Sequence, residues 1–392
     1  MKKQEESVTS KEHKKHSVIS RPAYGNFARN EWAIVGTPCG AIKTLADAVI
    51  KALSADYKCA YVDASHAHSD GGETLPGRMA AGAVAEYTDQ ISYHQFDLNT
   101  ELDPFQFRQF FSDMDAVLVN GNHQQAKAQV VVIDESKKAS LQKRLEQLTN
   151  VQLILLADNA KEVFDFVQEV IPDWQKLPLY RLSETDKIIT FFQKQLQQAK
   201  PVLNGLVLAG GKSVRMGQDK GTMQWHGKEQ RYYVADLLKQ FCPEVFISCR
   251  PEQQEEFDSN YKTVVDTFTG LGPYGAILSA FREQPDAAWL VVACDLPLLD
   301  QHTLQRLTDN RSISSVATTF ESPHDGFPEP LITIWEPKSY PLLLAFLAQG
   351  YTCPRKVLRN SDINMLKPIN PDALLNVNTP EESEKVKQMM QE

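Results

Sequence analysis

VLNGLVLAGGKSVRMGQDK, residues 202–220, decides the fold of the second half of the chain. An apolar strand in this stretch runs directly into a loop that holds glycines and basic residues but no apolar run. Gly210 and Gly211 let the backbone approach an anion closely, and the N–H groups of such a loop donate to phosphate oxygens. Arg215 and Lys220 add positive charge. The stretch therefore predicts a phosphate-binding loop at the carboxyl end of a strand.

A series of apolar segments follows this loop, separated by helical or loop segments. The strand candidates are 243–249, 261–266, 287–295, 312–320 and 330–336. Two of them end in an aspartate, Asp266 and Asp295, and open α/β sheets bind ligands at the carboxyl ends of their strands. Mg²⁺ needs only a few carboxylates beside substrate phosphates, so Asp295 is the predicted metal ligand. The alternative for Asp295 is an N-cap of the next helix.

The first half of the chain shows the same alternation. An apolar strand at 31–36 precedes a helical pattern at 41–55, and further apolar runs occur at 59–64, 115–121, 128–134 and 151–158. Alternating strands and helices predict a parallel sheet with helices on both faces. The expected fold class is thus α/β, with two three-layer αβα domains. We place a disordered tail at 1–29, the first domain at 30–200 and the second at 201–392, with the boundary before Pro201.

Composition excludes several classes of protein. The 392 residues carry 41 Lys and Arg against 50 Asp and Glu, a net charge of −9, so neither a nucleic-acid partner nor a membrane surface is expected. The six cysteines form no CxxC pair, which fits a reducing compartment. The N-terminus has no apolar signal region. We therefore expect a cytoplasmic protein.

The loop resembles the signature LxGGxSxRMGxDK of the nucleotidyltransferase superfamily and, within it, of the molybdenum cofactor guanylyltransferases. The resemblance covers about 203–384 and includes blocks around Asp266, around Asp295 and at 376–382. It implies a Rossmann-like nucleotidyltransferase fold that transfers GMP from GTP to the phosphate of molybdopterin (Mo-molybdopterin). Pyrophosphate is the second product. The implied cofactor is Mg²⁺, and molybdoenzymes or other proteins of cofactor biosynthesis are the implied protein partners.

The resemblance also assigns roles to residues. Arg215, Lys220 and Asp295 are the expected catalytic residues, with Asp295 holding the metal. The expected ligand-binding residues are Leu208, Ala209, Gly210, Gly211, Lys220, Ser248, Asp266, Asp295, Asn376 and Asn378. Asp266 would contact the guanine or the ribose, and Asn376 and Asn378 would face the acceptor.

Some of these assignments have alternatives. Ser248 stands where the family often has Asn, so selection of guanine or cytosine stays open. Thr379, Pro380 and Glu382 have the pattern of a helix start, which leaves only the two Asn residues of that block for function. The basic group 355–359 could face a phosphate, although a solvated helix face is the simpler interpretation. The alternative functions are a cytidylyl or sugar-phosphate nucleotidyltransferase and a non-catalytic protein that binds and delivers the cofactor.

Residues 31–134 resemble the accessory GTPase-like protein of molybdopterin-guanine dinucleotide biosynthesis. An intact phosphate loop reads GxxxxGK[ST]. Counted from Gly36, Ala41 and Ile42 replace the second glycine and the lysine, and Lys43 comes one place late. Asn120 replaces an expected acidic residue. We therefore expect a degenerate P-loop NTPase-like fold in which Ile42 faces the phosphate position and no nucleotide is hydrolysed.

Overall fold

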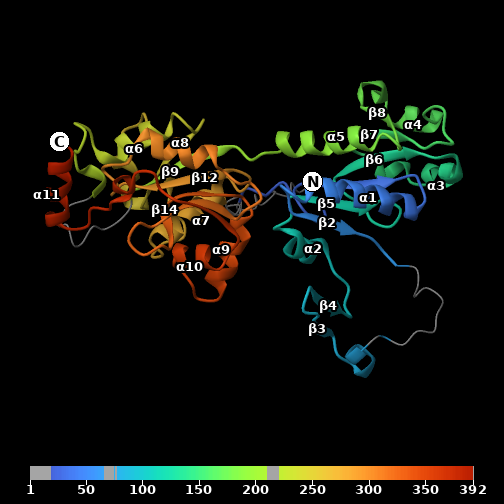
Figure 1. Cartoon of the computed structure of the whole chain (residues 1–392), viewed down its shortest axis with the longest axis horizontal. Coiled ribbons are helices and arrows are strands. Elements are labelled where there is room, and N and C mark those ends of the chain that lie inside the picture. Colours follow the sequence, from blue (N-terminus) through green and yellow to red (C-terminus); the bar gives the residue numbers. More distant parts are fainter. Residues whose placement is uncertain (1–18, 66–74, 76, 210–219, 392) are drawn as a thin grey trace, which may run out of the picture.

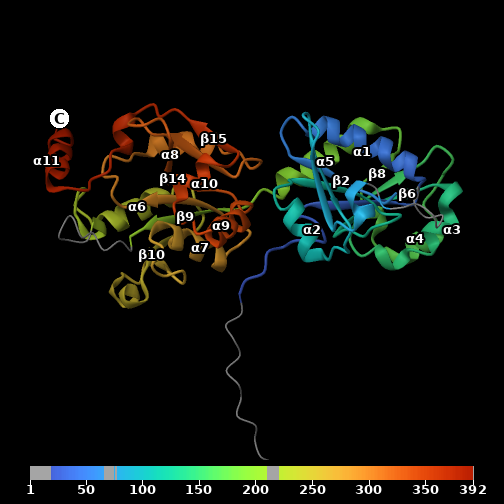
Figure 2. The ribbon, with the colours of Figure 1, turned by 90° about the horizontal axis from the view of Figure 1, so that it is seen from below.

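The computed structural model describes residues 19–65, 75, 77–209 and 220–391. They form two α/β units that lie side by side along the long axis of the molecule (Figures 1 and 2). The loop residues Gly210, Gly211 and Arg215 lie outside the described residues, as do 1–18 of the predicted tail.

The first unit contains a six-stranded sheet in the order β2-β5-β1-β6-β7-β8, and all of its pairings are parallel. Its strands are β1 (Glu31–Val35), β2 (Cys59–Val62), β5 (Ala116–Asn120), β6 (Ala128–Ile133), β7 (Val151–Leu156) and β8 (Leu179–Arg181). The four strands β1, β5, β6 and β7 are buried over most of their length because helices cover both faces.

Helices α1 (Cys39–Leu53) and α5 (Thr185–Gln198) pack on one face of this sheet. Ile42, Val49 and Phe192 are completely buried there. The other face is covered by α2 (Pro104–Phe111), α3 (Lys138–Gln142) and α4 (Asp165–Val170). A separate two-stranded hairpin, β3 (Ala85–Asp89) with β4 (His94–Leu98), extends away from this unit (Figure 1).

The second unit contains a seven-stranded mixed sheet in the order β11-β10-β9-β12-β14-β13-β15. Its strands are β9 (Leu203–Leu208), β10 (Val245–Cys249), β11 (Lys262–Val265), β12 (Ala288–Ala293), β13 (Ala317–Glu321), β14 (Pro328–Trp335) and β15 (Ile363–Leu366). The first four are mutually parallel, while β14 is antiparallel to β12 and to β13. The carboxyl ends of β9, β10, β11 and β12 therefore meet at one edge.

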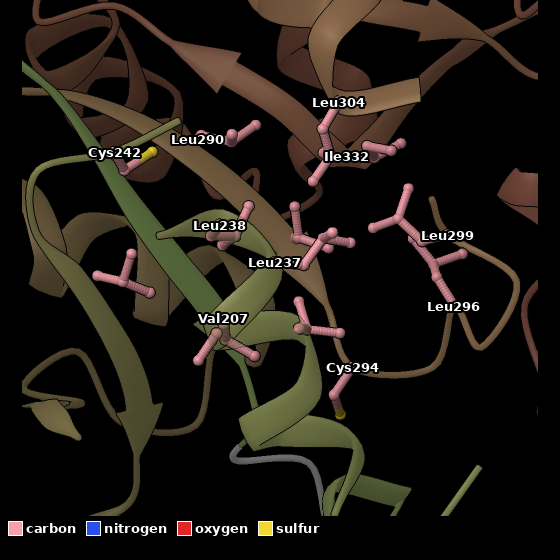
Figure 3. Packing of buried hydrophobic residues seen from close by; sticks show 14 of the residues in the cluster. Val207, Leu237, Leu238, Cys242, Leu290, Cys294, Leu296, Leu299, Leu304 and Ile332 are labelled. Carbon is pink, nitrogen blue, oxygen red and sulfur yellow. The ribbon is translucent and has the colours of Figure 1, made fainter. Parts of the chain in front are cut away.

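Helices again cover both faces of this sheet. On one face, α6 (Gln230–Leu238) and α8 (Gln301–Asp309) bury Leu237, Leu238 and Leu304 against strand residues such as Val207 and Leu290 (Figure 3). On the other face lie α7 (Pro273–Glu283), α9 (Ser339–Ala348) and α10 (Pro354–Arg359). The last helix, α11 (Pro380–Met389), lies at the far end of the unit (Figure 1).

The predicted fold class is confirmed, since both sheets are covered by helices on both faces. The strand expected at 312–320 begins only at Ala317, and the strands β3, β4, β8 and β15 were not predicted. Phe27 and Ala28, which the prediction assigned to the tail, are buried. Their backbone N–H groups donate to the carboxylate of Glu31, at 2.7 and 2.9 Å, so this polar stretch is fixed by a buried acid. The ranges of the two domains stay a prediction.

Polar contacts join the two units. Asp115 of the first unit accepts hydrogen bonds from Lys338 Nζ at 2.7 Å and from Ser314 Oγ at 2.6 Å. Arg29 pairs with Asp286 at 2.9 Å. Within the described part of the chain, no helix is both long and apolar enough to cross a membrane.

Candidate active site

The candidate site lies at the carboxyl edge of the second sheet. β9 and β12 are neighbours in register, with Leu208 opposite Ala293, so the chain leaves both strands at the same place. Leu208 and Ala209 lie at the end of β9, directly before residues 210–219, and Asp295 follows β12. The N–H of Cys294 donates to the carbonyl of Leu208 at 3.3 Å, which holds the two strand ends together.

Three of the predicted site residues meet at this edge. The ammonium of Lys220, at the start of the turn Lys220–Thr222, lies 3.1 Å from Asp295 Oδ2 and 2.6 Å from Asn378 Oδ1. The side chains of Lys220 and Asp295 are only 18% and 17% exposed. The N–H of Val377 donates to the Asp295 carbonyl at 2.9 Å and thereby ties the third segment to the strand end.

The block at 376–382 starts a helix and also reaches the candidate site. Thr379 caps α11, Pro380 is its first residue, and Glu382 completes a capping box. The carboxylate of Glu382 also accepts from the N–H of Asn378 at 2.6 Å. The cap therefore fixes the backbone of Asn378, and the side chain of Asn378 remains directed to Lys220.

The geometry at Asp295 fits a cation ligand better than a helix cap. The helix that follows is capped by Asp300, whose carboxylate accepts from the N–H of Thr303 at 2.7 Å. Asp295 Oδ1 is buried and accepts no hydrogen bond from any described residue. A buried carboxylate oxygen without a donor is costly unless a ligand reaches it. The described residues include no group of three acidic, histidine or cysteine side chains placed for a metal, so an ion here would take its other ligands from substrate and water.

Asp266 follows β11 at the same edge. Burial raises the pKa of this carboxyl to about 6, and the positive charge of Arg250 only partly offsets the effect. Its Oδ1 is buried and lacks a hydrogen-bond partner within the described ranges. Arg250 was not predicted as a site residue. It directly follows β10, and this position at the carboxyl end of a predicted strand could have indicated it. Ser248 lies inside β10 opposite Leu208 and is 1% exposed.

A cavity of about 440 Å³ lies beside Asn378. Asn376, Arg355 and Glu329 also line it, and none of the sequence patterns indicated Glu329. Arg355 is held by Asp325 at 2.7 Å and by Glu329 at 3.4 Å. The other two members of the basic group do not converge with it, because Lys356 lies over the ring of Tyr351 and Arg359 over that of Phe327.

The loop of the first unit differs from the expectation in one respect. Ile42 does not face a phosphate position: it is completely buried between α1 and the sheet. Helix α1 begins at Cys39, so only residues 36–38 separate it from β1. Lys43 lies on the second turn of the helix, where its ammonium pairs with Asp63 at 3.2 Å. Asn120 donates to the same carboxylate at 2.8 Å.

The mixed sheet and the strand-end aspartate fit a nucleotidyltransferase type of α/β domain. Residues 205–365 match the model of the MobA-like NTP transferase domain. A molybdenum cofactor biosynthesis bifunctional protein from Synechocystis is 37% identical over 46% of this chain and 52% of its own length, so the chain spans about half of that relative. A probable molybdenum cofactor guanylyltransferase from Nostoc is 31% identical over 46% of this chain and 88% of its own.

The chain belongs to the family of MobA-like NTP transferases. Among solved structures, the molybdopterin-guanine dinucleotide biosynthesis protein A from Archaeoglobus fulgidus is similar over 48% of this chain and 98% of its own, with 23% identity and a TM-score of 0.41.

Proposed function

We propose that the second unit transfers GMP from GTP to the terminal phosphate of molybdopterin and releases pyrophosphate. The observation that carries this proposal is the meeting of Lys220, Asp295 and Asn378 at the sheet edge where β9 ends. The relatives named guanylyltransferases point to the same reaction.

The chemistry that the residues must supply is mostly positioning and charge stabilisation. The acceptor phosphate is already anionic, so no general base is needed to create the nucleophile. Lys220 would offset the negative charge that develops on the triphosphate, and Arg215 of the loop would add a second cation. Asn378 orients the lysine ammonium through its 2.6 Å hydrogen bond.

Mg²⁺ would be held by Asp295, whose inner oxygen Oδ1 accepts no hydrogen bond from the described residues. When bound, it would neutralise phosphate charge and fix the geometry of the triphosphate. Lys220 contacts the other oxygen, Oδ2, so the carboxylate can serve both cations.

The two substrates would approach from different sides. Asp266 at the end of β11 would accept from the guanine N1–H and N2–H groups or from the ribose, which needs its ionised form. The acceptor would use the cavity lined by Asn376, Asn378 and Arg355. Its phosphate would then compete with Asp325 and Glu329 for the guanidinium of Arg355.

The test is a panel of GTP, CTP, ATP and UTP, scored for pyrophosphate release with Mg²⁺ and molybdopterin on the full chain. We expect release with GTP, dependent on the acceptor. Release with CTP instead would identify a cytidylyltransferase, and release with a sugar phosphate as acceptor would identify the other enzyme class. Nucleotide binding without release in any combination would contradict the transferase proposal and favour a delivery protein.

A further inference from the structure

A second group of reactive side chains lies in the first unit, far from the nucleotide site in the chain. It collects at the carboxyl edge of the parallel sheet, where three neighbouring strands end. Cys39 follows β1, Asp63 follows β2, and His123 follows β5. The proposed nucleotide transfer uses none of these residues.

The sulfur of Cys39 faces two nitrogen atoms. His123 Nε2 lies 3.3 Å from Sγ, and Asn122 Nδ2 donates to Sγ at 3.7 Å. Asn122 is itself held by its second hydrogen bond, to the carbonyl of Thr37 at 2.8 Å. A thiol within hydrogen-bond reach of an imidazole is the arrangement by which a base activates a nucleophile.

The imidazole has an anionic neighbour. Asp63 Oδ1 lies 3.9 Å from His123 Nε2, and both side chains are mostly buried, at 16% and 13% exposure. Burial raises the pKa of Asp63, but hydrogen bonds from the Ala64 amide and from Lys43 outweigh it, so the net pKa lies below its ordinary value. The carboxylate is therefore ionised at neutral pH, and it lies on the side of the imidazole ring that faces the thiol.

Two further features distinguish Cys39 from the other cysteines. Cys39 is the first residue of the 15-residue helix α1, whose N-terminal end carries partial positive charge. Its side chain is also within reach of solvent, whereas Cys242, Cys249 and Cys294 are buried. Cys59 is half-buried, and burial raises its pKa to about 11.

We propose that Cys39 and His123 form a nucleophilic thiol site that reacts with low-molecular-weight disulfides. The proton of the thiol passes to His123 Nε2, and Sγ attacks one sulfur of the disulfide. A new S–S bond forms as the old one breaks, and the leaving thiolate takes the proton from His123. Cys39 is oxidised to a mixed disulfide, and half of the incoming disulfide is reduced to a thiol.

Disulfide exchange needs few groups from the surrounding structure. It requires an accessible thiol, a base that takes its proton and a donor that returns a proton to the leaving group. Cys39 is within reach of solvent, and His123 Nε2 lies 3.3 Å from its sulfur, so the pair can supply all three.

The experiment exposes the full chain at neutral pH to glutathione disulfide, quenches with an alkylating reagent and maps the modified cysteines by mass spectrometry. Cys353 is the internal control because it is exposed and lies on the other unit. We expect Cys39 to be glutathionylated at least about tenfold faster than Cys353; a positioned base typically contributes about 100-fold or more, and the lower exposure of Cys39 offsets part of that gain. Equal or slower reaction of Cys39 would overturn the proposal.

Two variants separate the role of the imidazole from simple exposure. His123→Asn should slow the reaction of Cys39 by about tenfold and leave that of Cys353 unchanged. Asn122→Ala should slow Cys39 less, because it removes a hydrogen bond but no proton carrier. Thermal melting checks that each variant is folded, and His123→Gln replaces His123→Asn if the latter melts early. An unchanged rate in a folded His123 variant would also overturn the proposal.

Discussion

Replacing Lys220 with alanine tests the centre of the candidate site. In the resting structure the ammonium bridges Asp295 and Asn378, and the change removes both hydrogen bonds at once. During transfer the same ammonium would face the phosphates. The variant therefore has one effect on stability and another on rate, and the two can be measured separately.

The size of each effect follows from the surroundings of the lysine. A hydrogen bond to a charged group stabilises a protein by about 1.5–3 kcal/mol. The Lys220–Asp295 pair is mostly but not completely buried, so we expect its removal to lower the free energy of unfolding by about 1–2 kcal/mol. Losing a preorganised charge on the transferring group costs about 100- to 1000-fold in kcat. Activity should thus fall far more than stability.

Pyrophosphate release at saturating GTP and Mg²⁺ measures the rate, and urea unfolding measures the stability. Lys220→Arg is the conservative comparison and should keep part of the activity, since the charge remains. Lys262→Ala is the matched control because it breaks a lysine–glutamate pair, with Glu244, at the amino end of β11. Lys220→Ala could lose stability and still turn over within about threefold of the wild type. In that case the lysine only stabilises the fold, and its assigned role in neutralising the phosphates is wrong.

Further predictions follow from other residues. Asp295→Asn should keep the fold but lower transfer about 100-fold at saturating Mg²⁺, because an amide binds the ion poorly; near-normal turnover would remove the metal role. Since the pKa of Asp266 is raised to about 6, its ionised fraction falls about tenfold between pH 7 and pH 5, so the KM for GTP should rise by a similar factor. A flat KM over that range, or the same rise in Asp266→Asn, would contradict this. The full chain carrying Asp295→Asn should hydrolyse neither GTP nor ATP, and Mg²⁺-dependent hydrolysis abolished by Lys43→Ala would show a working loop in the first unit. Lys338→Ala should cost about 3–5 kcal/mol in unfolding free energy, because it leaves Asp115 buried without its cation; a loss below about 1 kcal/mol would refute that estimate.

The raised pKa of Asp266 also determines the direction in which the free energy of unfolding changes with pH. The folded-state pKa of Asp266 lies above the ordinary value of 3.8 because burial disfavours the charge. Between about pH 6 and pH 4 the folded protein therefore binds a proton that the unfolded chain does not. This residue contributes added stability as the pH falls through that window, in contrast to a carboxylate held by a salt bridge. Binding of GTP and stability should thus change in opposite directions.

The sequence was most informative where local pattern and chemistry coincide. Apolar strands ending in a glycine loop or an aspartate predicted both the sheet edge and the positions of Lys220 and Asp295. The contact between Lys220 and Asn378 spans 158 residues, and the family motif predicted that both belong to the site but not that they touch. The basic group at 355–359 is close together in the sequence, but its members do not form one site. Lys356 lies over the ring of Tyr351, whereas Arg359 lies over that of Phe327.

The missed elements lack a strong local signal for physical reasons. β8 and β15 are short edge strands of three and four residues, and none of their residues is fully buried, so neither shows a clear apolar pattern. The packing of Phe27 depends on the carboxylate of Glu31, which is 1% exposed and accepts N–H groups from the preceding turn. Because the segment is fixed by a polar contact, its sequence has too few apolar residues to predict a folded structure.

Counting positions in the loop of the first unit assigned the wrong surroundings to Ile42. The pattern predicted a lost phosphate loop because Ile42 occupies the lysine position. In the structure Ile42 belongs to the core, and α1 already begins at Cys39, so three residues replace the wider turn that surrounds a phosphate. Restoring a lysine at position 42 would place a charge in the core and would not restore the loop. The short connection instead brings Cys39 beside His123, and this is the pair on which the proposed thiol site rests.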